Sequence, residues 1–429
     1  MRQRARQSLA SPTLRTITGL AGGNTLAMAV GIVGSLVQAR FITPEELGYF
    51  RSFAIVTGYV FFLQLGLFGA LARFYPYYIG KGQRERGLVV AEICQAWIVM
   101  VTVLVGGVYL VLALRALVIG DWPAGLAWLV QVVAIAGFFY GGYLGATYRS
   151  GHDFNTVSRG AVLASVVSLV TLPIFLIMPY IALVLRSSAG SLANLVFLHR
   201  RRPLRLPWRF NFREWHALVK VSLPMFTADY AANTGWAVVE TTLILHFLGT
   251  DALGLWSMSF MLLEAANKVA QAITAVYIPR IIETFGRTER VRAGLVLCRK
   301  PLLLGTPAML LMAGVGALLL PLIVPILMPN YAAAIPAMIL MLLTLPLIVL
   351  DLPYSLLVAM GKITQQNLVA VVGLGSFVIL TLIAMRLNLG LTAIVGASLF
   401  GRGIRLATIY GLLFRASRHE ASFELIQSN

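Results

Sequence analysis

The chain has 429 residues, of which 59% are hydrophobic and only 12% are charged, and its mean hydropathy is +0.84. Soluble globular domains carry about 25% charged residues, so this chain has too little polar surface to face water on all sides. Composition therefore excludes an aqueous enzyme. It also excludes a nucleic-acid-binding domain, although the net charge is +18, because in so apolar a chain a basic excess is typical of cytoplasmic loops.

We predict an all-α polytopic membrane protein with twelve transmembrane helices, since a spanning helix needs about 20 mainly apolar residues. The apolar stretches are continuous rather than alternating, which excludes a closed β-barrel. The first stretch is longer than a signal-peptide core, and we interpret it as an uncleaved span. Met178 and Pro179 alone separate the fifth span from the sixth. In chain order, the predicted spans cover residues 16–39, 48–72, 88–114, 123–147, 159–178, 179–198, 217–245, 252–279, 301–328, 332–360, 364–385 and 388–414.

The distribution of basic residues predicts the orientation, because cytoplasmic loops are rich in Lys and Arg. With the N-terminus inside, the predicted outer loops contain only Arg40, Arg115 and Arg386. Most of the other Lys and Arg residues, of which the chain has 34 in all, fall in the inner segments. We therefore expect a multi-pass membrane protein with both termini in the cytoplasm.

A basic segment that begins at Arg200 divides the predicted spans into six plus six. The turn Phe41-Ile-Thr-Pro-Glu-Glu-Leu-Gly-Tyr-Phe50 follows the first span, and Phe247-Leu-Gly-Thr-Asp-Ala-Leu-Gly-Leu-Trp256 follows the seventh, with Phe, Leu and Gly at matching positions. Six spans in each half keep the two halves in the same orientation. This predicts two parallel six-helix lobes around a central cavity: residues 1–199, a basic cytoplasmic linker 200–214, and residues 215–429.

Two smaller features concern helix geometry. Gly137, Gly141 and Gly145 recur at four-residue spacing in the fourth span, and we expect them to let a neighbouring helix approach closely. Pro224 in the seventh span and the Gly22-Gly23 pair in the first would bend the helices that open each half, or else be tolerated near their ends.

Ionisable side chains within spans are the main candidates for function, because each costs about 2.5–3.5 kcal/mol at mid-bilayer and so usually faces protein or a water-filled cavity. One interpretation is a cavity whose cations hold an anionic head group beside carboxylates that couple transport to a proton or sodium ion. The other is ion pairs that lock helices together, as Glu264 and Lys268 would four residues apart, with snorkelling at the ends, as for Arg51 and Glu240. The substrate-binding candidates are Arg51, Arg186, Lys268, Arg402 and Arg405, and the ion-coupling candidates are Asp229, Glu264 and Asp351.

Motifs for enzymatic chemistry are missing from the sequence. It has no phosphate-binding G-x-x-x-x-G-K-[ST], no H-E-x-x-H and no Cys/His cluster, and Cys94 and Cys298 give neither a disulfide framework nor a metal-ligand spacing. We therefore expect a protein that is not an enzyme and that has no metal or other cofactor. A membrane glycosyltransferase or polysaccharide polymerase is one alternative. Such a protein would require a large external loop or loop carboxylates, and the predicted outer loops are short.

The chain resembles the polysaccharide-exporter branch of the multidrug/oligosaccharidyl-lipid/polysaccharide exporter superfamily, the bacterial O-antigen and exopolysaccharide lipid-linked oligosaccharide flippases. The resemblance rests on the twelve spans in two halves and on the turn after the first span, Phe41 with Leu47-Gly48-Tyr49-Phe50, which recurs as Phe247 with Leu253-Gly254. The start of the seventh span, Ser222-Leu-Pro-Met-Phe226, also fits. It implies two lobes around a cationic cavity that receives the pyrophosphate and sugars of an undecaprenyl-linked glycan, while the lipid tail stays in the bilayer.

The resemblance also bears on individual residues and partners. Related lipid-linked precursor flippases carry essential cations on spans two and eight, where this chain has Arg51 and Lys268, whereas span one offers only Asn24 and Thr25. The expected partners are a lipid-linked oligosaccharide, membrane lipid and, in the same pathway, a polysaccharide polymerase and glycosyltransferases. Nucleic acid is not expected.

Two other transporter classes compete with this interpretation. A cation-coupled multidrug exporter of the same superfamily would favour acidic residues over arginine in its cavity. A major-facilitator transporter also has six plus six spans, but the segment Gly80-Lys-Gly-Gln-Arg-Glu-Arg86 does not fit the G-x-x-x-D-R-x-G-R-R pattern of that family.

Overall fold

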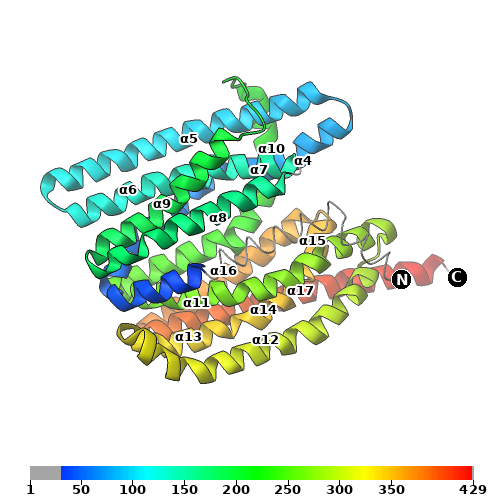
Figure 1. The fold of residues 1–429 in the computed structure, drawn as a ribbon. Coiled ribbons are helices and arrows are strands. Elements are labelled where there is room, and N and C mark those ends of the chain that lie inside the picture. The colour runs from blue at the N-terminus through cyan, green and yellow to red at the C-terminus, as the bar shows by residue number, and fades with distance from the viewer. Residues whose placement is uncertain (1–29, 152, 428–429) are drawn as a thin grey trace, which may run out of the picture. The chain divides into compact units, whose positions relative to one another are not determined.

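The structure, a computed structural model, describes residues 30–151 and 153–427, and throughout these residues the regular structure is helical (Figure 1). Gly22-Gly23, Asn24, Thr25 and the basic residues of the N-terminus, together with the start of the first predicted span, lie outside the described residues. The all-α class and the polytopic membrane character are confirmed. Nine helical stretches of the described part are long and apolar enough to cross a membrane, and the count of twelve stays a prediction.

Two compact units divide the chain. The first unit consists of the described residues up to Ile42 together with Phe53–Phe226, and the second consists of Thr43–Ser52 and the chain from Thr227 onward. The basic segment 200–214 thus belongs to the first unit, and the start of one early helix belongs to the second. The lobe limits expected from the duplication, 1–199 and 215–429, stay a prediction.

The helices up to the basic segment follow the predicted spans except for the second, expected over 48–72, which is broken at Leu65 and Gly66 and continues to Gly80. The break between Leu176 and Pro179 confirms that the fifth and sixth spans are two helices. Proline suits the first turn of a helix, as Pro179 does in α9, because backbone N–H groups in that turn have no helical acceptor and proline therefore loses no hydrogen bond. The elements are Val30–Phe41, α3 (Pro44–Val60), the 3₁₀ turn η1 (Phe61–Gln64), α4 (Leu67–Gly80), α5 (Arg84–Ile119), α6 (Trp122–Ala136), the π turn η2 (Gly137–Gly141), α7 (Gly142–Ser150), α8 (Phe154–Val170), η3 (Leu172–Leu176) and α9 (Pro179–Arg200).

The π turn changes the geometry of the fourth span, and the expected close packing at its glycines is wrong. A π turn adds a residue to the helical turn and shifts the register of everything after it. A Cβ atom at Gly137 would meet open space, and one at Gly141 would make only an ordinary contact. The tight glycine is Gly142, where a Cβ atom would come within 2.9 Å of the Phe68 ring.

The helices after the basic segment depart more from the predicted spans. The seventh span, expected to run over 217–245 without interruption, is broken at Asn233, and the backbone turns again at Gly249, which has a φ of 81°. Pro346 and Pro353 divide the tenth span because neither ring nitrogen can donate a helical hydrogen bond. The elements are α10 (Phe212–Ala232), α11 (Thr234–Thr288), α12 (Val291–Leu327), η4 (Pro329–Ala334), α13 (Ile335–Leu342), α14 (Thr344–Leu350), α15 (Tyr354–Ala359), α16 (Ile363–Arg386) and α17 (Gly390–Gln427).

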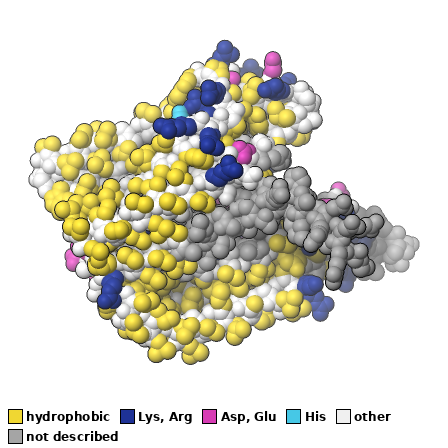
Figure 2. All heavy atoms as spheres, in the orientation of Figure 1, with side chains coloured by type: hydrophobic (Ala, Val, Ile, Leu, Met, Phe, Trp, Pro, Cys, Tyr) yellow, Lys and Arg dark blue, Asp and Glu magenta, His cyan; other side chains and the backbone are white. Residues whose placement is uncertain are grey.

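Hydrophobic side chains cover the sides of the helices, as a lipid environment requires (Figure 2). Leu318 in α12 is 76% exposed and Val118 in α5 is 87% exposed. Large apolar side chains are exposed in this way on the nine apolar helical stretches of the described chain. Water solvates such a surface poorly, whereas the hydrocarbon of a bilayer solvates it well. The helices therefore bury their backbone polar groups and present their apolar faces to the bilayer.

The two duplicated turns cross each other tightly within the second unit. A Cβ atom at Gly48 in α3 would overlap the backbone of Thr250, and one at Gly254 in α11 would overlap the backbone of Pro44. In the aligned repeats Gly48 corresponds to Gly254 and Pro44 to Thr250, so each contact is the counterpart of the other. A self-complementary contact of this kind is what a local twofold axis produces, and only glycine permits it at these two positions.

We predict that Gly48→Ala and Gly254→Ala each destabilise the protein, because the added methyl group would collide with backbone rather than with a movable side chain. Overpacking typically costs about 1–3 kcal/mol, which should lower the midpoint of thermal unfolding in detergent. Gly106→Ala is the matched control, since a Cβ atom there meets nothing within 4 Å. A wild-type midpoint for both variants would show that the crossing is not tight.

Candidate functional site

Seven of the eight candidate residues lie in the second unit, and Arg186 lies in the first. Arg51 comes from the middle of α3, and Asp229 from α10. Glu264 and Lys268 belong to α11, Asp351 follows α14, and Arg402 and Arg405 belong to α17. Most of the candidates therefore fall among the helices of one compact unit.

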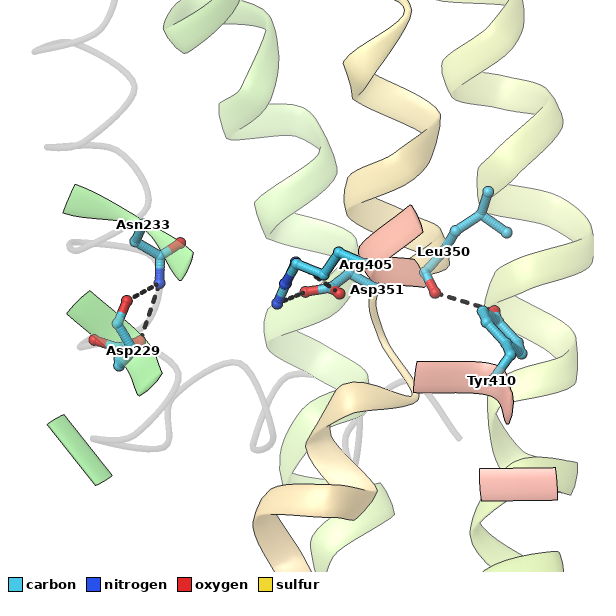
Figure 3. Close-up of polar contacts among 6 residues, drawn as sticks. All are labelled: Asp229, Asn233, Leu350, Asp351, Arg405 and Tyr410. Carbon is cyan, nitrogen blue, oxygen red and sulfur yellow. Dashed lines mark hydrogen bonds and ion pairs between the residues drawn. The ribbon is translucent and has the colours of Figure 1, made fainter. Parts of the chain in front are cut away.

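Asp351 and Arg405 form a bidentate ion pair (Figure 3). Arg405 Nη1 lies 3.0 Å from Asp351 Oδ1, and Arg405 Nη2 donates to Asp351 Oδ2 over 3.2 Å. The Arg405 side chain is only 12% exposed and the Asp351 side chain 27%. The guanidinium also lies 5.2 Å from the centre of the Tyr354 ring, and Gly373 on α16 leaves room for the Arg405 stem, since a Cβ atom there would come within 2.8 Å of it.

The proline-induced break in the tenth span is what brings Asp351 to this position. Asp351 lies in the turn between α14 and α15, where Leu352 N–H donates to the Val349 carbonyl in place of a helical bond from Pro353. Beside it, the Tyr410 hydroxyl of α17 donates to the Leu350 carbonyl over 3.0 Å (Figure 3). The turn is thus held against α17 by one ion pair and one hydrogen bond.

Arg402 lies one helical turn before Arg405 and is half-buried. Its guanidinium lies 4.9 Å from the centre of the Trp236 ring, a cation–π contact. Gly401 lets that ring approach α17, because a Cβ atom there would come within 3.1 Å of it. Arg402 Nε is buried without a hydrogen-bond partner in the described structure, so this guanidinium keeps capacity to bind a further group.

Glu240 on α11 is the residue that sequence reasoning undervalued. Snorkelling toward the outer surface was one interpretation, and the structure contradicts it, because Glu240 is only 5% exposed. It accepts hydrogen bonds from Trp256 Nε1 and from Ser398 Oγ, both at 3.2 Å, and Ser398 in turn accepts one from Trp236 Nε1 at 2.9 Å. These partners are distant in sequence, so no local pattern signals them.

The buried carboxylate of Glu240 also acts electrostatically on Arg402, as do Asp351 and Glu264. The same indole, that of Trp236, contacts the Arg402 guanidinium with its ring face and the Glu240 network with its N–H. Several carboxylates therefore attract Arg402, but none of them forms a bidentate ion pair with it among the described residues, as Asp351 does with Arg405.

Asp229 marks the broken end of α10. Asn233 Nδ2 donates to the Asp229 carboxylate over 3.0 Å, and Asn233 N–H donates to the Asp229 carbonyl over 3.1 Å, so the pair closes the helix where α11 begins (Figure 3). The Asp229 side chain is exposed and interacts electrostatically with Arg405. Its carboxylate therefore remains accessible within the electrostatic reach of Arg405.

Glu264 and Lys268 form the expected pair on one face of α11, with Lys268 Nζ 3.9 Å from Glu264 Oε2. The side chains are 41% and 52% exposed respectively, and Asn267 also donates to Glu264 over 3.3 Å. An exposed pair at this spacing contributes little to stability, typically about 0.3–0.5 kcal/mol. Lys268 is therefore free to exchange Glu264 for another anion.

Arg51 and Arg186 have different environments. Arg51 Nη2 contacts the Met261 sulfur at 3.8 Å, and its Nε is buried without a hydrogen-bond partner among the described residues. Arg186 instead donates to Gln38 Oε1 at 2.5 Å and to the Gly31 carbonyl at 3.3 Å, which ties α9 to the helix Val30–Phe41 of the first unit. The assignment of either residue to substrate binding stays a prediction.

The second unit thus brings two arginines of α17, Arg402 and Arg405, together with carboxylates from three other segments. Guanidinium forks suit phosphate as well as carboxylate groups, and carboxylates suit protons and cations. Among the described residues, no three His, Cys, Asp or Glu side chains come together in a way that could hold a metal ion. The chemistry available is therefore anion binding and proton or cation exchange.

Several solved transporter structures share this fold at low sequence identity. An inward-facing multidrug resistance MATE family transporter of the MOP superfamily superposes with a TM-score of 0.71 at 14% identity, covering 92% of this chain and 96% of that one. The lipid II flippase MurJ, in an inward closed conformation, gives 0.66 at 10% identity, with coverages of 95% and 91%. The Vibrio cholerae MATE transporter VcmN gives 0.62 at 16% identity, with coverages of 96% and 98%.

The fold is therefore one that MATE transporters and a lipid II flippase have in common. A comparison with curated protein sequences finds no match. Residues 13–285, well over half of the chain, match the family described as "Polysaccharide biosynthesis protein", so this multi-pass membrane protein belongs to the polysaccharide biosynthesis protein family.

Proposed function

We propose that this transporter flips undecaprenyl-pyrophosphate-linked oligosaccharide units across the bacterial inner membrane by alternating access, for export of O-antigen or exopolysaccharide. The observation that carries the proposal is the pair of arginines on α17, with Arg402 Nε unsatisfied and buried in a chain of the polysaccharide biosynthesis family. Both termini lie in the cytoplasm in this proposal, as the basic segments predict.

The physical problem that such a protein solves is the transfer of a charged, hydroxyl-rich head group through hydrocarbon. Each unpaired hydroxyl costs several kcal/mol there, roughly 4–8 kcal/mol on a cyclohexane scale, and each isolated charge costs more. Paired guanidinium groups lower this barrier because each can donate two parallel hydrogen bonds to a phosphate. The lipid tail can stay in the bilayer throughout.

The Asp351–Arg405 pair suggests how substrate binding would be coupled to an ion. A substrate phosphate offers Arg405 the same bidentate geometry that the Asp351 carboxylate now provides. When Arg405 turns to the phosphate, Asp351 loses its counter-charge and takes up a proton or a sodium ion. Asp229 and Glu264 interact electrostatically with Arg405 and Arg402 respectively and are the further ion-coupling candidates. No other cofactor is required.

We predict that Arg402→Ala and Lys268→Ala each impair glycan export while leaving membrane insertion intact, because each removes a cation that the head group would use. Loss of one charge-assisted hydrogen bond, about 1.5–3 kcal/mol, corresponds to a decrease of about tenfold or more in export rate. Accumulation of lipid-linked repeat units at the inner leaflet is the measurement. Arg386→Ala, at the exposed end of α16, is the control, and normal export by both variants would refute the cation assignment.

We also predict that Asp351→Asn uncouples transport from the ion gradient, because an amide cannot take up a proton or cation when Arg405 turns to the phosphate. The measurement is flipping in proteoliposomes with and without an imposed proton or sodium gradient. Asp121→Asn serves as control, since Asp121 caps α6 through its bond to Ala124 N–H and Asn caps equally well. Retained gradient dependence in Asp351→Asn, with loss in Asp229→Asn, would transfer the coupling role to Asp229.

A cation-coupled multidrug exporter is the second candidate function. It is favoured by the carboxylates around Arg402, since Glu240, Asp351 and Glu264 all act on this residue. We expect no efflux of a cationic dye by the purified protein in proteoliposomes. Dye efflux that survives Arg402→Ala but is lost in Asp229→Asn would support the exporter and contradict the flippase.

The proposed partners follow from the substrate. Glycosyltransferases assemble the lipid-linked unit on the cytoplasmic side, and a polysaccharide polymerase consumes it on the other side. Genes for such enzymes beside the gene for this chain would support the proposal, and genes for drug regulators in their place would count against it.

A further inference from the structure

A cavity of about 340 Å³ lies in the first unit, where the end of α9 and the segment after it pack against α5 and the π turn. Its polar lining comes from Gln95 on α5, Tyr140 in the π turn, His199 at the end of α9 and Arg202 just beyond. Trp208 lies at the rim and is 70% exposed. None of these residues is among the candidates for the transport site, seven of which belong to the second unit.

The polar side chains form a connected group of hydrogen-bond donors. Arg202 Nη1 donates to His199 Nε2 at 2.7 Å, and His199 Nδ1 lies 2.8 Å from the Tyr140 hydroxyl. In the neutral tautomer that accepts at Nε2, Nδ1–H donates to the Tyr140 oxygen. The Tyr140 O–H and the other N–H groups of Arg202 then remain available to a ligand. The Gln95 side chain is held in place by two hydrogen bonds: its Oε1 accepts one from the Tyr143 hydroxyl at 3.2 Å, and its Nε2 donates one to the Leu206 carbonyl at 3.4 Å.

Arg202 differs from the other arginines of the basic segment. Arg200, Arg201, Arg205 and Arg209 are exposed, whereas Arg202 is half-buried in the cavity wall. Among the described residues, no carboxylate pairs with Arg202 within ion-pair distance. The cavity therefore carries positive charge without an internal counter-ion, and it would bind an anion.

The apolar surroundings of the cavity indicate what kind of anion. Val99 and Thr102 of α5 line it, and the next turn of α5 presents Val103 and Leu104, which are 65% and 61% exposed. Basic side chains gather near the end of α9 beside a broad hydrophobic surface (Figure 2). An exposed tryptophan such as Trp208 is typical of the level of the lipid head groups. The ligand thus has an anionic head and an apolar tail.

We propose that this cavity binds the phosphate head group of an anionic phospholipid on the cytoplasmic side, with its acyl chains along the exposed face of α5. Arg202 and the Tyr140 hydroxyl donate to the phosphate oxygens, and Val103 and Leu104 contact the chains. Basic pockets at the cytoplasmic ends of spanning helices bind such head groups. The site goes beyond the proposed transport function, since its occupant is a resident lipid and not the cargo.

The test is native mass spectrometry of the full-length protein in detergent. Phosphatidylglycerol and phosphatidylcholine with the same acyl chains are titrated in parallel. Because a basic residue near an anionic lipid surface contributes about 1 kcal/mol, and a charge-assisted bond contributes more, we expect Arg202→Gln to weaken phosphatidylglycerol binding about five- to tenfold. Phosphatidylcholine, whose choline cation neutralises the phosphate charge, should bind more weakly to the wild-type protein and lose less affinity in Arg202→Gln.

Arg209→Gln is the matched control, because it removes the same charge from the same segment at an exposed position outside the cavity lining. We expect it to change the affinity less than about twofold, as for a screened surface charge. Tyr140→Phe keeps the ring and removes only the O–H donor, and it should weaken binding about threefold, in line with one neutral hydrogen bond. This second variant tests the site if Arg202→Gln does not fold.

Four outcomes would overturn the proposal. Wild-type affinity in both Arg202→Gln and Tyr140→Phe would show that the cavity is not the site, and an equal loss in Arg209→Gln would show that binding is only general charge attraction. Displacement of the lipid by excess inorganic phosphate would assign the site to free phosphate. Tighter binding of undecaprenyl phosphate than of phosphatidylglycerol, with the same dependence on Arg202, would assign it to the polyprenyl carrier.

Discussion

The high cost of an unpaired charge or backbone group in hydrocarbon is the constraint on which this structure depends. It makes the described chain helical, because a helix satisfies its own backbone hydrogen bonds. It also explains the environment of the charges. Asp351 and Arg405 share two contacts between the same planar groups, Glu240 is held by an indole and a hydroxyl, and Arg186 is tied to a glutamine and a carbonyl.

The same constraint makes the buried guanidinium nitrogens that lack a hydrogen-bond acceptor candidates for ligand binding. Arg402 Nε and Arg51 Nε are both buried without a hydrogen-bond partner in the described structure. A native protein tolerates such atoms where a ligand, water or ion completes the set. In the function proposed above, a phosphorylated head group is the ligand that would complete them, and the proposed exchange of Arg405 between Asp351 and phosphate would link its binding to an ion.

Departures from regular helices position these groups. The break at Asn233 exposes Asp229, and the prolines of the tenth span create the turn that presents Asp351 to α17. The π turn at Gly137–Gly141 places Tyr140 beside His199. The crossing of Gly48 and Gly254 joins the two duplicated turns, where any side chain would collide with backbone. Helical breaks buried in protein or lining a cavity are tolerated in a membrane because other groups satisfy the freed backbone.

The sequence by itself determined the membrane class, the helical fold, the separation of the fifth and sixth helices and the set of ionisable residues within spans, because these follow from composition and from periodicity within one helix. It also identified the Glu264–Lys268 pair, since residues four apart on a helix are neighbours. Only the tertiary structure decided that Asp351 pairs with Arg405, 54 residues away, that Arg402 lies on Trp236, and that Glu240 is buried. These contacts depend on which helix faces pack together, and that is fixed by the whole unit and not by any local pattern.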